Sequence, residues 1–397
     1  MSTGTGVDDK VLDTSLPVTQ ARNQQLTTRD ELLLLLGKAL DQKVADILFE
    51  PGSGQINFRI NGRVALHKAV TTEKIQQFVN MVADAAGIPH HHFRHHPESG
   101  TLFIRHKGKL LEASAAFVPT IAGVAAAIRF DRKVPRELDE IGFEPEQVQA
   151  VKLSLSSARG LVLIAGTTGS GKSATAEACL RHLEVNKNLR VFEIGDPIEF
   201  KSVNRTQVAL SKEITWKSAL QAALDFRADV IFAGEIRTSE QAKQLFEAAL
   251  RAPLVLATLH ARDVATTLNR LQRMGIENYQ MAAALSLIIA QELRRQICQE
   301  CKPTVEGQSE RAAACENCSG TGMAGLTIIA EVLPITQEIG AQIERRASGE
   351  RIMRHAVSKD GVLPIEEVER RKAEAGLIPP RSQDPGIEAV DGSARVK

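Results

Sequence analysis

Aromatic side chains are scarce in this chain of 397 residues: Phe, Trp and Tyr together make up 4%, and Trp and Tyr occur once each. Proteins that hold single-stranded nucleic acids stack the bases on aromatic side chains within a positively charged groove. The formal net charge here is only +1. The composition therefore argues against a nucleic-acid translocase, and no DNA or RNA partner is expected.

Long apolar runs are also missing. No stretch approaches the ~20 apolar residues of a membrane-spanning helix, and residues 1–30 lack the apolar core of a signal peptide. We therefore expect a cytosolic protein whose thiols stay reduced. The content of 43% hydrophobic and 24% charged residues is ordinary for globular proteins, and the length suffices for two or three domains.

Changes in composition along the chain predict its organisation. Strands that alternate with helices predict a parallel sheet in the central part, and a proline-containing polar C-terminus predicts disorder. The expected segments are a mobile tail (1–27), a small α/β domain (28–130), a charged linker (131–139), a larger α/β domain (140–335), a helical region (336–376) and a disordered tail (377–397).

Local signals predict several elements of the first domain. Thr27 precedes two acidic residues and a run of leucines, which indicates the start of a capped helix. Residues 45–51 are expected to form a strand. Residues 56–64 are expected to form part of a hairpin with an Asn-Gly turn.

The most informative motif is the complete P-loop at residues 166–173, which reads Gly-Thr-Thr-Gly-Ser-Gly-Lys-Ser. An apolar run that predicts a buried parallel strand precedes it, and a helical stretch follows. Its glycines let successive backbone N–H groups face one anion. Lys172 is expected to reach the β- and γ-phosphates, and the Ser173 hydroxyl to ligate Mg²⁺. We therefore expect ATP and Mg²⁺ as cofactors.

Two further apolar runs end in carboxylates. Asp196 and Glu199 follow the first run, where acids beside a P-loop can hold Mg²⁺ or its waters; the alternative is an Asp-Pro turn with solvated acids. Glu235 ends the second run and is expected to be the general base that orients the attacking water, unless it caps the next helix. The expected nucleotide-binding residues are Gly166, Thr167, Thr168, Gly169, Ser170, Gly171, Lys172, Ser173, Ala174 and Asp196.

A fourth apolar run, at residues 254–259, places His260 at another strand end. An imidazole there can sense the γ-phosphate, although a lone His after a strand also fits a structural role. In this order the four runs resemble the secretion ATPase superfamily of type II secretion and type IV pilus motors. Its landmarks are a P-loop, an aspartate box E-D-P-I-E, a Walker B strand ending G-E-I-R-D and a histidine box S-T-L-H. The matching positions are residues 166–173, 196–199, 234–237 and 258–260.

The resemblance extends from about residue 45 to residue 333 and includes the N-terminal patterns S-D-I-H-I-E-P and R-I-D-G at residues 45–51 and 59–64. It implies a RecA-like P-loop NTPase core, a smaller PAS-like N-terminal α/β domain and a C-terminal helical and zinc-binding region. It further implies a homo-hexameric ATPase on the cytoplasmic side of the inner membrane. Such a motor would dock on a membrane platform protein, contact the membrane only through that partner, and power pilus assembly or type II secretion. A conjugative or type IV secretion motor is the close alternative.

The chain departs from the family pattern at several positions. These losses keep open a degenerate ring subunit that binds nucleotide without turnover, yet Lys172, Ser173 and Glu235 are retained and favour hydrolysis. Arg129 aligns with a family arginine that faces the nucleotide, and Arg59 and Arg63 are weaker candidates. The expected catalytic residues are Glu235, Glu199, His260 and Arg129. The departing positions are Gly195, Thr238, Gln221, Asp225, Glu292 and Glu112.

Four of the five cysteines form two Cys-x-x-Cys pairs, Cys298/Cys301 and Cys315/Cys318. Two thiolates from each turn can complete a tetrahedral Zn²⁺ site, so a structural zinc is expected; free thiols are the alternative. Cys179 lies on an apolar helix face and is expected in the core. Two basic clusters, residues 294–295 and 370–372, are expected on solvated faces of helices.

Overall fold

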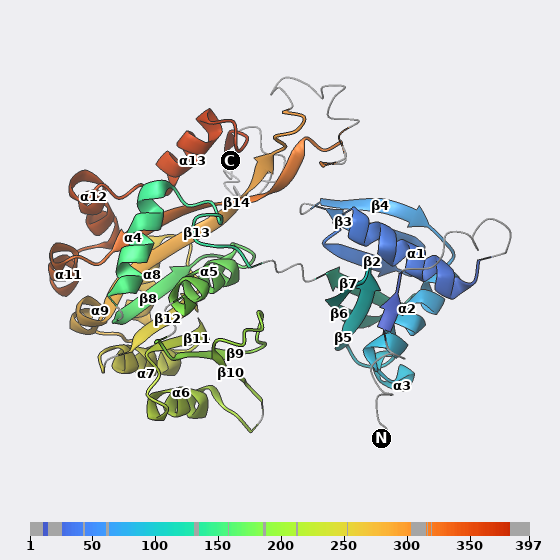
Figure 1. The fold of residues 1–397 in the computed structure, drawn as a ribbon, viewed down its shortest axis with the longest axis horizontal. Coiled ribbons are helices and arrows are strands. Elements are labelled where there is room, and N and C mark those ends of the chain that lie inside the picture. The colour runs from blue at the N-terminus through green and yellow to red at the C-terminus, as the bar shows by residue number, and fades with distance from the viewer. Residues whose placement is uncertain are drawn as a thin grey trace, which may run out of the picture. The chain divides into compact units, whose positions relative to one another are not determined.

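The computed structural model describes two compact units, residues 1–132 and 133–397, which are treated separately below (Figure 1). The residues it does not describe are 1–10, 15–25, 43, 61–62, 131–134, 158, 186–187, 212, 252, 303–314, 316, 319 and 382–397. Among the described residues, no helix is both long and apolar enough to cross a membrane.

The first unit is a seven-stranded sheet in the order β1-β5-β6-β7-β2-β3-β4. All neighbours are antiparallel except β1 and β5. The longer helices, α1 and α2, cover the sheet (Figure 1), and their leucine, valine and phenylalanine side chains fill one core. The elements are β1 Val11–Asp13, α1 Thr28–Asp41, β2 Asp46–Glu50, β3 Gln55–Ile60, β4 Arg63–Ala69, α2 Thr72–Ala86, α3 His90–Phe93, β5 Glu98–His106, β6 Lys109–Thr120 and β7 Gly123–Phe130.

The local predictions for this unit agree with the structure, with one correction. Thr27 caps α1 in a reciprocal capping box with Asp30, and β3 pairs with β4 across a two-residue connection from Ile60 to Arg63. The Asn-Gly turn itself lies outside the described residues. Strand β1 falls in the segment expected to be a mobile tail, and its backbone pairs with β5; three residues suffice for this because Val11 and Leu12 are buried.

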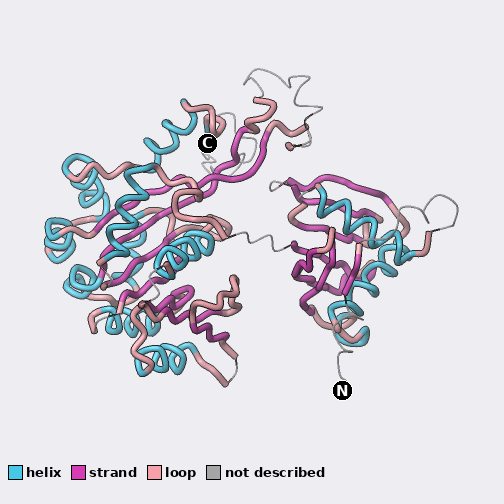
Figure 2. The backbone as a smooth tube through the Cα atoms, viewed as in Figure 1, coloured by secondary structure: helices cyan, strands magenta, loops and turns pink. Residues whose placement is uncertain are grey.

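The second unit contains a sheet in the order β10-β9-β11-β12-β8-β13-β14 (Figures 1 and 2). Its elements are α4 Pro145–Ser156, β8 Gly160–Ala165, α5 Lys172–Glu184, β9 Val191–Gly195, β10 Thr206–Ala209, α6 Trp216–Asp225, β11 Val230–Ile236, α7 Ser239–Ala249, β12 Leu254–Leu259, α8 Val264–Arg273, α9 Asn278–Ala284, β13 Leu285–Ile297, β14 Met323–Pro334, α11 Gln337–Glu344, α12 Gly349–Lys359 and α13 Ile365–Glu374.

Strand β8 is continuously apolar because both of its faces are buried. Leu161 and Leu163 pack into the core formed with α6, α7, α8 and α9, whereas Val162 and Ile164 pack into the core formed with α4 and α5. Successive side chains of a strand point to opposite faces, so a strand covered on both sides is apolar throughout. Cys179 lies fully buried in the second core, as expected, and burial raises the pKa of its thiol to about 12.

Several expectations for this unit need correction. The sheet is mixed, because β14 runs antiparallel to β13. Arg294 lies on β13 rather than on a helix, and its buried guanidinium pairs with Glu369 of α13. Lys372 of the second basic cluster is also buried and donates to the carbonyl of Gly142 at 2.5 Å. Neither cluster is therefore simply a solvated helix face.

The predicted linker and C-terminal tail are ordered where the structure describes them. Leu138 is buried, and its neighbour Asp139 accepts hydrogen bonds from Lys152 of α4. The backbone N–H of Ile297 donates to the carbonyl of Leu377 at 2.8 Å, and Ile378 is fully buried. An apolar side chain that finds a core contact outweighs the local composition that predicted disorder. Residues 131–134 and 382–397 lie outside the described residues.

Candidate nucleotide and metal sites

The P-loop lies between β8 and α5, the strand–loop–helix arrangement that phosphate binding requires. Gly169 and Gly171 have φ values of 79° and 86°, the left-handed region that glycine adopts without steric cost. A Cβ added at Gly169 would meet nothing within 4 Å, whereas one at Gly166 would collide with the Ser170 hydroxyl. The loop is therefore open at Gly169 and closed at Gly166 against the Ser170 side chain and the carbonyl of Gln291, which suits an anion cradle.

Gln291 of β13 holds this loop in place. Its Nε2 donates to the carbonyl of Ser170 at 2.7 Å, and its Oε1 accepts the Thr175 hydroxyl of α5 at 2.7 Å. Both Gln291 and Thr175 are buried. The sequence did not predict Gln291 as a site residue, because its contacts link residues more than 100 positions apart.

Lys172 opens α5 and faces the loop. Its Nζ donates to the carbonyls of Gly166 and Thr167, both at 2.9 Å. Burial lowers the pKa of Lys172, and the nearby charge of Glu235 opposes this effect. The ammonium group therefore lies within the P-loop, where P-loop proteins use it to pair with phosphate oxygens.

A cavity of about 320 Å³ lies beside the P-loop, at the carboxyl ends of β9, β11 and β12. It joins the predicted residues Lys172, Ser173, Asp196, Glu199 and Glu235. Ligands of open α/β sheets bind at this edge of the sheet. Several lining residues were not predicted as site residues. They are Glu177, Leu180, Glu193, Phe200, Trp216, Phe232, Arg237 and Gln241.

Oxygen donors converge at one end of this cavity. The Ser173 hydroxyl donates to Oε1 of Glu199 at 2.8 Å, and Asp196 lines the same cavity. A hydroxyl and carboxylates are the hard oxygen ligands that Mg²⁺ accepts, together with phosphate oxygens and waters. The donor set fits Mg²⁺. Both acids of the aspartate box are exposed, and Glu199 faces the P-loop serine.

Glu235 lies near the end of β11, and its side chain is 34% exposed. Arg237 Nε forms an ion pair with its Oε2 at 3.0 Å. Glu235 does not cap the next helix, because Thr238 and Gln241 form a reciprocal capping box at the start of α7. A solvent-accessible carboxylate in the cavity is able to bind and orient a water molecule, the role expected of a general base.

His260 does not line this cavity. His260 follows β12 and is exposed, whereas Thr258, two residues earlier, lines the cavity. Arg129 belongs to the first unit, where its Nε donates to Oδ1 of the buried Asp46 at 2.9 Å. Arg59 Nη1 donates to the other oxygen of Asp46, also at 2.9 Å. The Arg63 side chain lies outside the described residues.

The four paired cysteines gather in one place. Their sulfur atoms all lie within 4.8 Å of one another, with 3.8 Å between Cys298 and Cys315 and 3.7 Å between Cys301 and Cys318. Burial raises the pKa of Cys298, but backbone N–H groups of Cys301 and Glu300 outweigh it and bring the pKa to about 7. Four converging sulfurs fit the tetrahedral ligand set of a structural zinc.

Comparisons with known proteins agree with this geometry. A sequence model of the type II/IV secretion system protein family matches residues 24–378. The type IV pilus assembly ATPase PilB of Thermus thermophilus is 32% identical over 365 residues, which cover 85% of this chain and 39% of that protein. The protein transport protein HofB homolog of Escherichia coli (strain K12) is 30% identical over 390 residues, which cover 89% of this chain and 81% of that protein. The chain thus spans less than half of the Thermus relative.

Solved structures share the fold. The ATPase DotB of Legionella pneumophila has a TM-score of 0.71 at 18% identity and covers 91% of this chain and 95% of its own. The pilus retraction motor PilT, solved with bound ADP, has a TM-score of 0.65 at 21% identity and covers 89% and 95%. These identities show the fold, and the sequence match shows the family: this chain belongs to the type II/IV secretion system protein family.

Proposed function

We propose that this chain is a motor subunit that hydrolyses ATP to drive pilus assembly or type II secretion. The observation that carries this proposal is the single cavity that joins Lys172, Ser173, Glu199 and Glu235. Lys172 would bind the β- and γ-phosphates, Ser173 and Glu199 would hold Mg²⁺, and Glu235 would orient the attacking water. Bound Mg²⁺ would supply charge neutralisation at the phosphates. Relatives named as a type IV pilus assembly ATPase and a type II secretion system ATPase support the same activity.

The test is phosphate release from ATP by the purified chain of 397 residues. We expect turnover that requires Mg²⁺ and that is lost, together with ATP binding, in Lys172→Ala. That substitution removes the charge that pairs with the β- and γ-phosphates. Near-normal ATP affinity in Lys172→Ala would contradict the P-loop assignment.

A degenerate ring subunit is the second candidate, and the aspartate box motivates it. A Cβ at Gly195 would lie 2.8 Å from Ile198 Cδ1 and 3.0 Å from the carbonyl of Pro197, so the loop in its present conformation has no room for the acid that stands there in the family. At two other departing positions, Gln221 Nε2 donates to Oδ1 of Asp225 at 2.8 Å. Tight nucleotide binding without turnover would favour this candidate.

We extend the proposal to the oligomeric state of the chain and to its location in the cell. A homo-hexamer in which Arg129 completes a neighbour's nucleotide site would explain why a buried carboxylate, Asp46, orients Arg129 and Arg59. The ring would lie on the cytoplasmic side of the inner membrane and dock on a platform protein of the machine. A conjugative or type IV secretion motor is the alternative function.

The remaining structural assignments are also proposals. We propose that the second unit is a RecA-like core, that the first is PAS-like, and that the functional segments are the domains 28–130 and 140–335 and the helical region 336–376. The four cysteines would hold one Zn²⁺ that staples the β13–β14 hairpin, since two of them follow β13 and two precede β14. Closed Cys₄ sites are structural rather than catalytic.

A further inference from the structure

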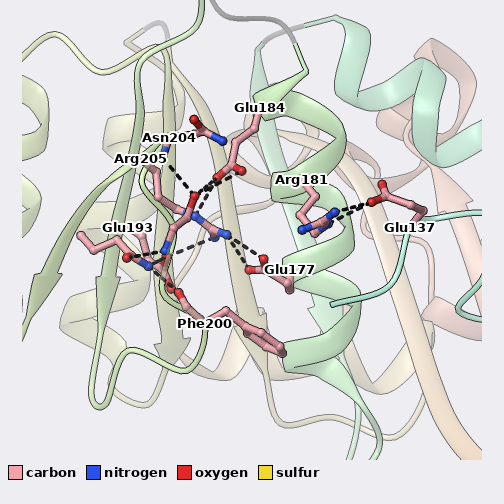
Figure 3. Close-up of polar contacts among 10 residues, drawn as sticks. Glu137, Glu177, Arg181, Glu184, Glu193, Phe200, Asn204 and Arg205 are labelled. Atoms are coloured by element: carbon pink, nitrogen blue, oxygen red, sulfur yellow. Dashed lines mark hydrogen bonds and ion pairs between the residues drawn. The ribbon is translucent and has the colours of Figure 1, made fainter. Parts of the chain in front are cut away.

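A buried charge cluster lies beside the cavity and outside every motif discussed so far. It consists of Arg205, Glu177, Glu184 and Glu193 and is here called the Arg205 cluster (Figure 3). The Arg205 side chain is 1% exposed, and the three carboxylates are 4%, 9% and 5% exposed. Glu177 and Glu193 also line the cavity. Burial of four charged side chains costs desolvation free energy, so we expect a role of this cluster beyond stability.

The guanidinium of Arg205 contacts all three carboxylates. Its Nη2 donates to both oxygens of Glu177 at 2.7 and 2.8 Å, and its Nη1 donates to Glu193 at 3.2 Å. Its Nε lies 2.7 Å from Oε1 of Glu184 as an ion pair. Burial raises the pKa of Glu177 and Glu193, while Arg205 opposes this shift. The ion pairs with Arg205 thus offset the free-energy cost of burying three carboxylates.

The cluster connects two elements of the nucleotide site. Arg205 ends the loop of residues 196–205, which runs from β9 to β10 and carries Asp196 and Glu199. Glu177 and Glu184 belong to α5, the helix that begins with Lys172. Arg205 therefore fastens the far end of the aspartate-box loop to the P-loop helix.

Gln207 reinforces this attachment from β10. Its Nε2 donates to Glu193 and to the carbonyl of Phe200, both at 2.6 Å, and its Oε1 accepts the backbone N–H of Ser202 at 3.0 Å. The Ser202 hydroxyl contacts Glu184 at 3.3 Å. The loop is held by polar contacts along its second half, and these contacts share carboxylates with Arg205.

At its first half the loop meets the same helix again. Glu199 accepts the Ser173 hydroxyl at 2.8 Å, and Glu177 lies one helical turn after Ser173, so both contacts fall on one face of α5. We propose that Arg205 is a positioning residue for Mg²⁺: it holds the loop of residues 196–204 against α5 so that Glu199 stays beside the Ser173 hydroxyl. This inference rests on the proposed nucleotide and Mg²⁺ site.

The test compares ADP affinity with Mg²⁺ and with EDTA, by calorimetry on the full chain. In Arg205→Gln we expect affinity in EDTA to be unchanged, because the P-loop backbone is untouched. The gain in affinity that Mg²⁺ confers should shrink about tenfold, the lower end of what loss of an outer-shell partner costs a metal site. Arg205→Lys keeps the charge but loses the fork that reaches three carboxylates, so its effect should be intermediate.

Hydrogen exchange gives a readout that does not need the metal. The N–H groups of Ser202 and Asn204 donate to Gln207 and to the Ser202 hydroxyl, and both should exchange faster in Arg205→Gln. Arg370→Gln is the control, because Arg370 lies on α13, where it pairs with Glu367 at 2.8 Å and with Glu374 at 2.6 Å. It should leave the Mg²⁺ effect and the exchange of the loop unchanged.

Arg205→Gln leaves three buried acids without their cation, so it risks failure to fold. In that event the triple variant Arg205→Gln/Glu177→Gln/Glu193→Gln removes most of the buried charge together, and the same two measurements apply. Unchanged Mg²⁺ dependence and unchanged loop exchange in either folded variant would overturn the proposal. A separate outcome is a wild-type chain that binds ADP more tightly with Mg²⁺ and yet releases no phosphate from ATP. That result would contradict the hydrolysis proposal, and the comparison of Mg²⁺ dependence between wild type and Arg205→Gln would still test the role of Arg205.

Discussion

Gln291→Leu is the most informative substitution outside the motifs, since it keeps the side-chain volume and removes both hydrogen bonds to the P-loop region. The carbonyl of Ser170 would lose its side-chain donor in a buried place. The Thr175 hydroxyl can turn to the carbonyl of Gly171, four residues earlier in the helix, which limits its own loss. With ~1–3 kcal/mol for each buried group left unpaired, we expect a destabilisation of about 2–4 kcal/mol.

This loss is measurable as a fall in the melting temperature. At about 2–4 °C per kcal/mol for a unit of this size, the transition of the second unit should shift down by roughly 4–16 °C. Nucleotide affinity should fall about tenfold if ordering the loop costs ~1.4 kcal/mol of binding free energy. Differential scanning calorimetry and titration with ADP measure the two effects.

A double-mutant cycle isolates the contact. Thr175→Val removes the hydroxyl that needs Gln291, so Gln291→Leu/Thr175→Val should cost less than the sum of the single variants. Gln272→Leu is the control: its amide makes one exposed contact, with Asn278 at 3.4 Å, and should change stability by less than ~0.5 kcal/mol. An unchanged melting temperature and affinity in Gln291→Leu would refute the idea that this residue sets the loop.

Three further predictions follow from the sites. Glu235→Gln should bind ATP normally and lose turnover by roughly 10²-fold, the scale of a lost general base; phosphate release equal to wild type would place the base elsewhere, with Glu199 next. Protein purified without chelator should carry about one zinc per chain, and removal of the metal should lower its melting temperature; freely titratable thiols with no zinc by metal analysis would contradict this. Arg129→Ala should lower turnover more than ATP binding, because a guanidinium acts on transition-state charge, and turnover per chain should rise with protein concentration as rings form. Arg105→Ala, an exposed pair partner of Asp13 in the same unit, is its control, and concentration-independent turnover by a demonstrated monomer that tolerates Arg129→Ala would exclude a shared site.

Much of the site was predictable because the residues that carry its chemistry lie within short segments of the sequence. The P-loop, the acids after β9 and β11 and the two cysteine pairs each depend on neighbours a few positions away. Parallel strands align their carboxyl ends, so the acids at two strand ends were expected near the loop, and Asp196, Glu199 and Glu235 do line one cavity with Lys172. His260 shows the limit of this rule: a strand end gives proximity, but the exposed side chain does not line the cavity.

By itself, then, the sequence determined the family, the phosphate cradle and the cysteine ligand set, because glycine conformations and Cys-x-x-Cys spacing are local properties of the chain. Only the tertiary structure decided that Gln291 holds the P-loop, that Arg205 ties the aspartate-box loop to α5, and that Arg294 is buried against Glu369. The physical reason is strand order. Gln291 reaches Ser170 because β13 pairs with β8, and a pairing between strands far apart in the chain is chosen by the packing of the whole core on both faces of the sheet.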